Sequence, residues 1–211
     1  MQLPLVAYVD FVSSLLPFGV GVSRRGNMTV PLRLFLIYML MGIVVEIVSY
    51  ILANQKISNL WLMQCYHLGA YSLLIVIIGY WVRGILLSRI LRWGLIVYIL
   101  TWGFAKFSFE PFTGPDQYTF SGVSIVIAVA SLVALFQRVS LENKDIWTDP
   151  QFWLISGLFL YFTGNLVLFS VLDQYIQVDR TTAFMVWTVH WYFDIMINVI
   201  FTRGYFLVGR R

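Results

Sequence analysis

The stretch WTVHWYFDIMINVIF, Trp187 to Phe201, decides how the chain folds. It lies in a run from Thr181 to Thr202 whose one charged side chain is Asp194, and such a run is long and apolar enough to cross a bilayer as a helix. On a helix His190, Asp194 and Asn198 recur every four residues and form one polar stripe. Because such a stripe avoids lipid tails, we expect it to face the interior of a helical bundle.

The composition of the whole chain gives the same class of protein. Hydrophobic residues make up 60% of the 211 residues and charged residues 11%, which excludes an ordinary soluble domain. The net charge of +4 does not indicate a nucleic-acid-binding protein, because the basic residues lie in short connections between apolar runs. We therefore predict an integral membrane protein that binds no nucleic acid.

Seven apolar runs, each near the length of a membrane span, follow one another along the chain. They are Leu3–Val22, Leu32–Ala53, Leu60–Trp81, Trp93–Lys106, Thr119–Gln137, Gln151–Leu172 and Thr181–Leu207. The fourth run is the shortest. The prediction is an all-α, polytopic membrane bundle of seven transmembrane helices, forming a single domain over residues 1–211.

The distribution of basic residues predicts the orientation of the bundle. Most Lys and Arg side chains fall in the connections on one side of the predicted membrane, whereas Lys56, Lys106 and Arg180 fall on the other. The basic side is expected to be cytoplasmic. We therefore place the N-terminus outside and the C-terminus in the cytoplasm of a multi-pass protein of the bacterial inner (plasma) membrane.

The two histidines hint at an internal repeat. Shifting the chain by the 123 residues that separate His67 from His190 also aligns Tyr38 with Tyr161 and lays the second and third spans on the sixth and seventh. This favours a 3+1+3 parallel repeat with the fourth span as linker. Coincidence between apolar segments is the alternative.

Polar side chains from five predicted spans fall at similar depths in the outer half of the bundle. The helical rise places them within about 10 to 18 Å of the outer end. The candidate ligand-binding residues are Asp10, Glu46, His67, Tyr71, Asn165, His190 and Asp194. We expect them to surround a common cavity.

Three interpretations of this cluster remain open. His67, His190, Asp194 and Glu46 have donor atoms suited to a divalent transition metal. A carboxylate beside an imidazole could instead bind a proton or a small polar ligand. Interhelical hydrogen bonds that only hold the bundle together are the third interpretation.

Several classes of protein are disfavoured because the sequence motifs that they need are absent. A retinal protein needs a Schiff-base lysine in a late span, and the seventh span has none. The chain carries no glycine-rich phosphate loop, cysteine-pair metal motif or nucleophile elbow. We therefore predict no catalytic residues and no cofactor, lean against an enzyme, and keep the divalent metal as an alternative.

Three segments resemble a group of small bacterial seven-helix membrane proteins associated with sensor histidine kinases. They are NQKISNLW before the third span, DPQFWLISGLFLYFTGN in the sixth and HWYFDIMINVIFTRGYF in the seventh. The resemblance implies a receptor-like input module and supplies no catalytic residues. Because the sequence ends at Arg211 without a kinase domain, signalling would require a separate cytoplasmic partner.

The leading hypothesis is a sensor or receptor-like protein for signal transduction, with a proton or small-ligand site in the outer half. One alternative is a metal-dependent intramembrane hydrolase that uses the same His, Asp and Glu side chains. Another is a small transporter or a structural subunit of a membrane complex.

Overall fold

Seven long helices make up the fold of the chain. The structure is a computed structural model that describes residues 4–114, 116–141, 145–175 and 180–209. The long helices are α1 (Leu5–Ser23), α2 (Val30–Asn54), α3 (Leu60–Trp81), α4 (Ile85–Ser108), α5 (Gln117–Leu141), α6 (Pro150–Tyr175) and α7 (Arg180–Phe206). Two short 3-10 turns, η1 (Arg25–Asn27) and η2 (Ile146–Thr148), lie in the connections.

Each long helix is long and apolar enough to cross a membrane, so the predicted seven-span, all-α architecture is confirmed over the described residues. The fourth span is longer than predicted, because α4 begins at Ile85 rather than at Trp93. Its extra turns carry Arg89 and Arg92, whose charges interrupt the apolar run. Both side chains are exposed, and long basic side chains near a helix end can reach the membrane surface.

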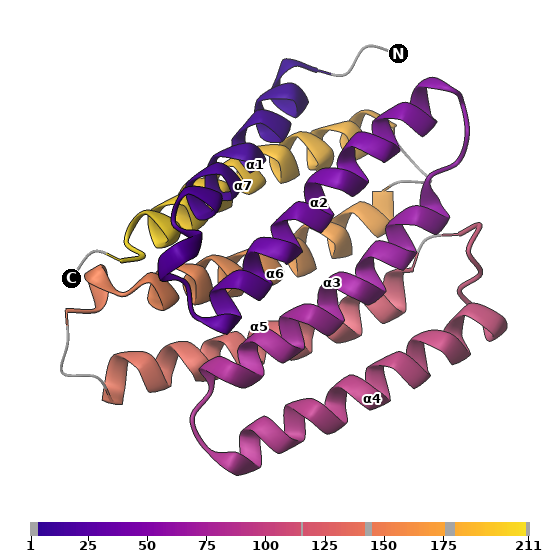
Figure 1. The fold of residues 1–211 in the computed structure, drawn as a ribbon. Coiled ribbons are helices and arrows are strands. Elements are labelled where there is room, and N and C mark those ends of the chain that lie inside the picture. The colour runs from indigo at the N-terminus through magenta and orange to yellow at the C-terminus, as the bar shows by residue number, and fades with distance from the viewer. Residues whose placement is uncertain (1–3, 115, 142–144, 176–179, 210–211) are drawn as a thin grey trace.

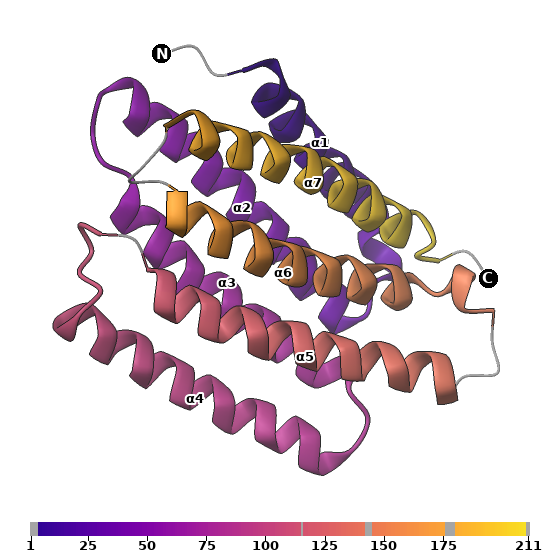
Figure 2. The ribbon, with the colours of Figure 1, turned by 180° about the vertical axis from the view of Figure 1, so that it is seen from behind.

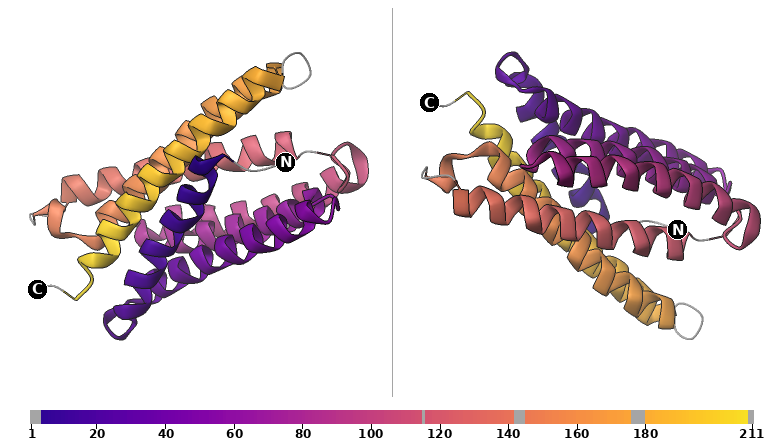
Figure 3. Two further views of the ribbon diagram at one scale, coloured as in Figure 1. Left: turned by 90° about the horizontal axis from the view of Figure 1, so that it is seen from above. Right: turned by 90° about the horizontal axis from the view of Figure 1, so that it is seen from below.

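The helices alternate in direction, and α4 lies at one edge of the bundle (Figures 1 and 2). We call the end that holds the connections 24–29, 82–84 and 145–149 the basic end, because most arginines lie there. Figure 3 shows the α6–α7 pair inclined to the α2–α3 pair, so the two pairs diverge toward the opposite end. Which end faces the cytoplasm stays a prediction.

The main helix contacts agree with the predicted repeat. The α2–α3 pair corresponds to α6–α7, α1 on α2 corresponds to α5 on α6, and α1 on α7 corresponds to α5 on α3. The linker α4 packs mainly on α3 and α5. Exchanging the first three helices with the last three therefore preserves the principal contacts, as a 3+1+3 repeat predicts.

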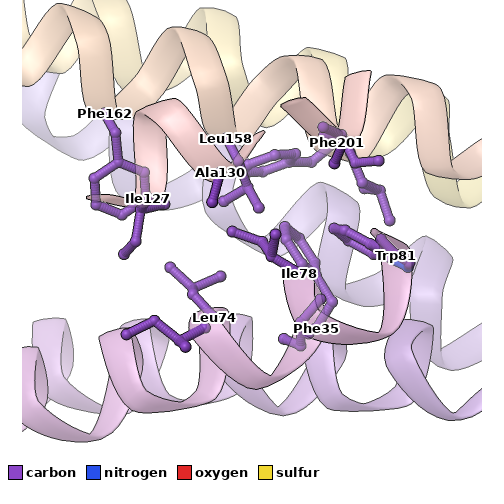
Figure 4. Close-up of a cluster of buried hydrophobic side chains, with 14 of the residues drawn as sticks. Phe35, Leu74, Ile78, Trp81, Ile127, Ala130, Leu158, Phe162 and Phe201 are labelled. Carbon is purple, nitrogen blue, oxygen red and sulfur yellow. The ribbon is translucent and has the colours of Figure 1, made fainter. Parts of the chain in front are cut away.

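An apolar core fills the middle of the bundle (Figure 4). Phe35 of α2 is fully buried, with its ring centroid 5.0 Å from that of Phe201 and 6.0 Å from that of Trp81. Nearer the basic end, the buried Tyr205 hydroxyl donates a hydrogen bond to the Leu32 carbonyl at 3.0 Å. These contacts join α7 firmly to α2 below the polar cluster.

The close approach of α6 and α7 depends on glycine. A Cβ atom at Gly164 would collide with the Phe193 ring. On the neighbouring pair, a Cβ at Gly42 would lie 3.3 Å from the Tyr66 hydroxyl. Both glycines thus permit tight packing at the level of the polar residues, as small residues do in membrane helix interfaces.

Candidate functional site

A cavity of about 300 Å³ lies between α1, α2, α3, α6 and α7, in the half of the bundle away from the basic end. Carboxyl side chains reach it from three helices, as Asp10 of α1, Glu46 of α2 and Asp194 of α7. The other polar and aromatic lining residues are Ser14, Tyr38, Tyr66, Tyr161, His190, Trp191, Asn198 and Phe201. Among the side chains that the structure describes, no Lys or Arg lines the cavity.

The polar stripe of α7 faces this cavity, as its spacing predicts. His190, Asp194 and Asn198 all line it. The Asn198 side-chain amide donates a hydrogen bond to the Ser13 hydroxyl of α1 at 2.9 Å. The stripe therefore points into the bundle and is tied to the first helix.

The His190 ring is held between two partners. Its Nδ1 lies 2.9 Å from Asn165 Oδ1 on α6, and its Nε2 lies 3.3 Å from Asp194 Oδ2 one turn along α7. Since an amide oxygen only accepts, Nδ1 must donate to Asn165. A proton is then needed between Nε2 and Asp194, on either the ring or the carboxyl, because otherwise two lone pairs would face each other.

Asp194 keeps one oxygen available. Its Oδ1 is buried and makes no hydrogen bond to any residue that the structure describes. The three carboxyls are close enough to repel one another electrostatically when ionised. Because ionised groups away from water are costly unless balanced, the cavity favours protons or a bound cation over three bare negative charges.

His67 belongs to a different cluster. Its Nδ1 lies 2.7 Å from Asp116 Oδ2, just before α5, and its ring stacks on Tyr71 with centroids 5.3 Å apart. Neither His67 nor Tyr71 lines the cavity. Tyr71 is buried against Phe120 and Phe162. The structure thus gathers Asp10, Glu46, His190 and Asp194, with Asn165 behind His190, and places the other two predicted residues elsewhere.

The interaction between His67 and Asp116 keeps the Asp116 carboxyl ionised. Burial would by itself raise the pKa of the Asp116 carboxyl. The hydrogen bond and charge of His67, together with the Lys106 ammonium, outweigh burial and hold this pKa below its ordinary value. Asp116 therefore stays a carboxylate that anchors the connection before α5 to α3.

The connection between α4 and α5 is built on buried polar contacts that the sequence analysis missed. Gln64 Nε2 donates to the Pro111 and Gly114 carbonyls at 3.3 and 2.5 Å. Glu110 is 2% exposed and lies 3.7 Å from the buried Lys106 ammonium. The four-residue spacing of Lys106 and Glu110 was the available signal, since residues so spaced meet on a helix.

Glu110 also caps the next helix. Its Oε1 accepts hydrogen bonds from the Tyr118 and Thr119 backbone N–H groups at 2.5 and 3.2 Å, and its Oε2 accepts one from the Thr119 hydroxyl at 2.6 Å. These N–H groups have no partner within the helix, so the carboxylate satisfies them and its charge suits the helix N-terminus.

The four side chains predicted as possible metal ligands do not all meet at one site. His67 lies outside the cavity that holds Glu46, His190 and Asp194. Within the part of the chain that the structure describes, no group of three or more His, Cys, Asp or Glu side chains could hold a metal ion. Metal binding stays a prediction for elemental analysis to test.

Comparisons of the chain with protein-family models, with curated proteins and with solved structures found no significant match. The resemblance to kinase-associated membrane proteins therefore stays an expectation from the sequence. The function has to be argued from the cavity itself.

Proposed function

We propose that this membrane protein is a seven-helix sensor whose cavity binds a small cation or protons and passes the binding event to a separate partner. One observation carries the proposal. Asp10, Glu46 and Asp194 come from three helices to one cavity, and no Lys or Arg in the described part of the chain lines it. Such a site gains most from an occupant that brings positive charge.

Occupancy would act on the packing of three helices. When the carboxyls are ionised and no cation is bound, repulsion among them pushes α1, α2 and α7 apart. A cation or added protons remove this repulsion and favour closer packing. A ligand that binds one packing better than another shifts the population toward it, which is the requirement for a sensor.

The α7 helix provides a route from the cavity to the basic end. Asp194 lines the cavity, and further along the same helix Phe201 packs on Phe35 and Tyr205 hydrogen-bonds to Leu32. A shift of α7 against α2 would therefore reach the start of α2. We propose that this protein lies in the bacterial inner membrane and that a cytoplasmic protein such as a histidine kinase detects the shift at the start of α2.

Tryptophan fluorescence offers a direct test, because Trp191 lines the cavity. Purified protein in lipid nanodiscs is titrated with acid and, separately, with tetramethylammonium chloride against sodium chloride. The signal of Trp191 is isolated by subtracting the spectrum of Trp191→Phe. We expect a saturable change that is lost in Asp194→Asn. A Trp191 signal that responds to neither titration in folded protein would refute the proposal.

A small cation transporter is the second candidate, because the helix contacts agree with a parallel repeat of the kind that some transporters contain. Proteoliposomes separate the two functions. A transporter accumulates a labelled organic cation inside the vesicles when a proton gradient drives uptake, whereas a sensor binds the cation without net uptake. The hydrolase alternative predicts instead a stoichiometric transition metal by elemental analysis.

A further inference from the structure

A second cavity, of about 270 Å³, opens between α3 and α4 toward the basic end. Its lining residues are Ile75, Val76, Gly79, Tyr80, Ser88, Leu91, Arg92 and Leu95. We call it the α3–α4 groove. It lies at the edge of the bundle, where α4 is the outermost helix (Figures 1 and 2), so it faces the lipid.

The floor of the groove is apolar. Ile75 and Leu91 are 3% and 6% exposed. At Gly79 a Cβ atom would meet nothing within 4 Å, so the missing side chain leaves room there. An apolar channel of this kind between two membrane helices suits a hydrocarbon chain, because a lipid tail fills it without loss of hydrogen bonds.

The α4 wall of the groove carries polar and basic side chains. Ser88 and Arg92 lie one turn apart on α4 and both line the groove, with Arg89 nearby on the same helix. Neither arginine makes a hydrogen bond or ion pair with a residue in the described ranges. The sequence has no Asp or Glu between Glu46 and Glu110, so neither α3 nor α4 carries an acidic side chain that could balance this charge.

We propose that the α3–α4 groove binds one anionic phospholipid, with its phosphate at Ser88 and the Arg92 guanidinium and an acyl chain that passes Gly79 and runs along Ile75, away from the basic end. The guanidinium and hydroxyl groups would donate hydrogen bonds to phosphate oxygens. A headgroup with net negative charge is preferred over a zwitterionic one, because a choline ammonium would meet Arg89 and Arg92. The proposal is independent of the function of the acidic cavity.

Lipid binding is measured by native mass spectrometry of the detergent-purified full chain, titrated with dioleoylphosphatidylglycerol or dioleoylphosphatidylcholine. We expect one phosphatidylglycerol bound in preference to phosphatidylcholine. Arg92→Gln should weaken this binding about fivefold, as expected for one basic residue near the membrane surface. The matched control is Arg25→Gln, which removes an exposed arginine of the basic end outside the groove. Equal losses in both variants would overturn the proposal.

A second pair of variants tests the acyl-chain seat. Gly79→Leu adds a side chain to the lining of the groove, with its Cβ more than 4 Å from other atoms, and Gly94→Leu adds the same side chain to α4 at a position that does not line it. Lipid should be lost from Gly79→Leu and kept by Gly94→Leu.

Inorganic phosphate serves as the probe for a headgroup-only site. Three results would overturn the assignment to a whole phospholipid. Inorganic phosphate could displace the lipid completely, or both glycine variants could retain the lipid equally. The third result is a lipid-free dimer that Gly79→Leu disrupts.

Discussion

Replacing Glu110 by alanine is expected to destabilise the protein strongly. The substitution removes three hydrogen bonds at the start of α5, and loss of such a cap costs about 0.5 to 2 kcal/mol. It also leaves the Lys106 ammonium, which is 5% exposed, without its carboxylate 3.7 Å away. Breaking a buried ion pair from one side costs about 3 to 5 kcal/mol. Since the two effects overlap, we expect a loss of about 3 to 5 kcal/mol in the free energy of unfolding.

A double variant separates the two contributions. Glu110→Gln keeps an oxygen that accepts from the Tyr118 and Thr119 N–H groups, and Lys106→Met removes the unbalanced charge while keeping the side-chain length. The double variant should therefore lose only about 1 to 2 kcal/mol. Reversible unfolding in mixed micelles, followed by circular dichroism, measures both values. A Glu110→Ala loss below about 1 kcal/mol, or a double variant no more stable than Glu110→Ala, would refute the account.

Two further predictions concern His67 and the glycine contacts. Because the pKa of Asp116 is lowered in the folded state, its stabilisation is complete above the unfolded value of 3.8 and is lost as the pH falls through the lower folded value. Asp116→Asn should therefore melt at a lower temperature than the wild-type protein at pH 7, and its melting temperature should depend less on pH in acid. If Asp116→Asn or His67→Phe leaves the acid dependence of the melting temperature as it is in the wild type, this account is contradicted. Gly164→Ala should cost about 1 to 3 kcal/mol through its collision with Phe193, whereas Gly122→Ala, which meets nothing within 4 Å, should be neutral or stabilising. Equal melting temperatures for the two alanine variants would count against the close α6–α7 packing.

The spans could be predicted because apolar runs of membrane length are an unambiguous signal. The third span matches α3 at both ends. The start of α4 was missed because Arg89 and Arg92 lower the hydropathy of turns that are nonetheless helical. Hydropathy reports the depth of a segment in the membrane, whereas backbone hydrogen bonding continues past that boundary.

The cavity was predicted only in part, for a geometric reason. Depth along each helix follows from the rise per residue, so Asp10, Glu46 and Asp194 were expected at similar depths, and all three line the cavity. The direction in which a helix face points does not follow when the helix is apolar nearly all round, as α3 is. His67 and Tyr71 were expected at the common cavity, but their shared face meets Phe120 of α5 instead.

The contacts of Asp116 and the capping contacts of Glu110 could not be predicted from the sequence. They arise from the path of residues 109–114, which fold back so that Gln64 of α3 donates hydrogen bonds to the Pro111 and Gly114 carbonyls. Such a path depends on tertiary packing rather than on any local pattern. The charged residues of a short connection between spans are usually exposed, and here Glu110 is buried.

The most direct test of the central claim is the proton count when a cation enters the acidic cavity. Isothermal titration of the protein in nanodiscs with tetramethylammonium, repeated in buffers of different ionisation enthalpy, gives both affinity and protons released per site. We predict saturable binding with release of protons, lost when Asp194 is replaced by Asn and absent with the neutral analogue tert-butanol. Folded protein that binds no cation and exchanges no protons would show that Asp10, Glu46 and Asp194 do not form a functional site.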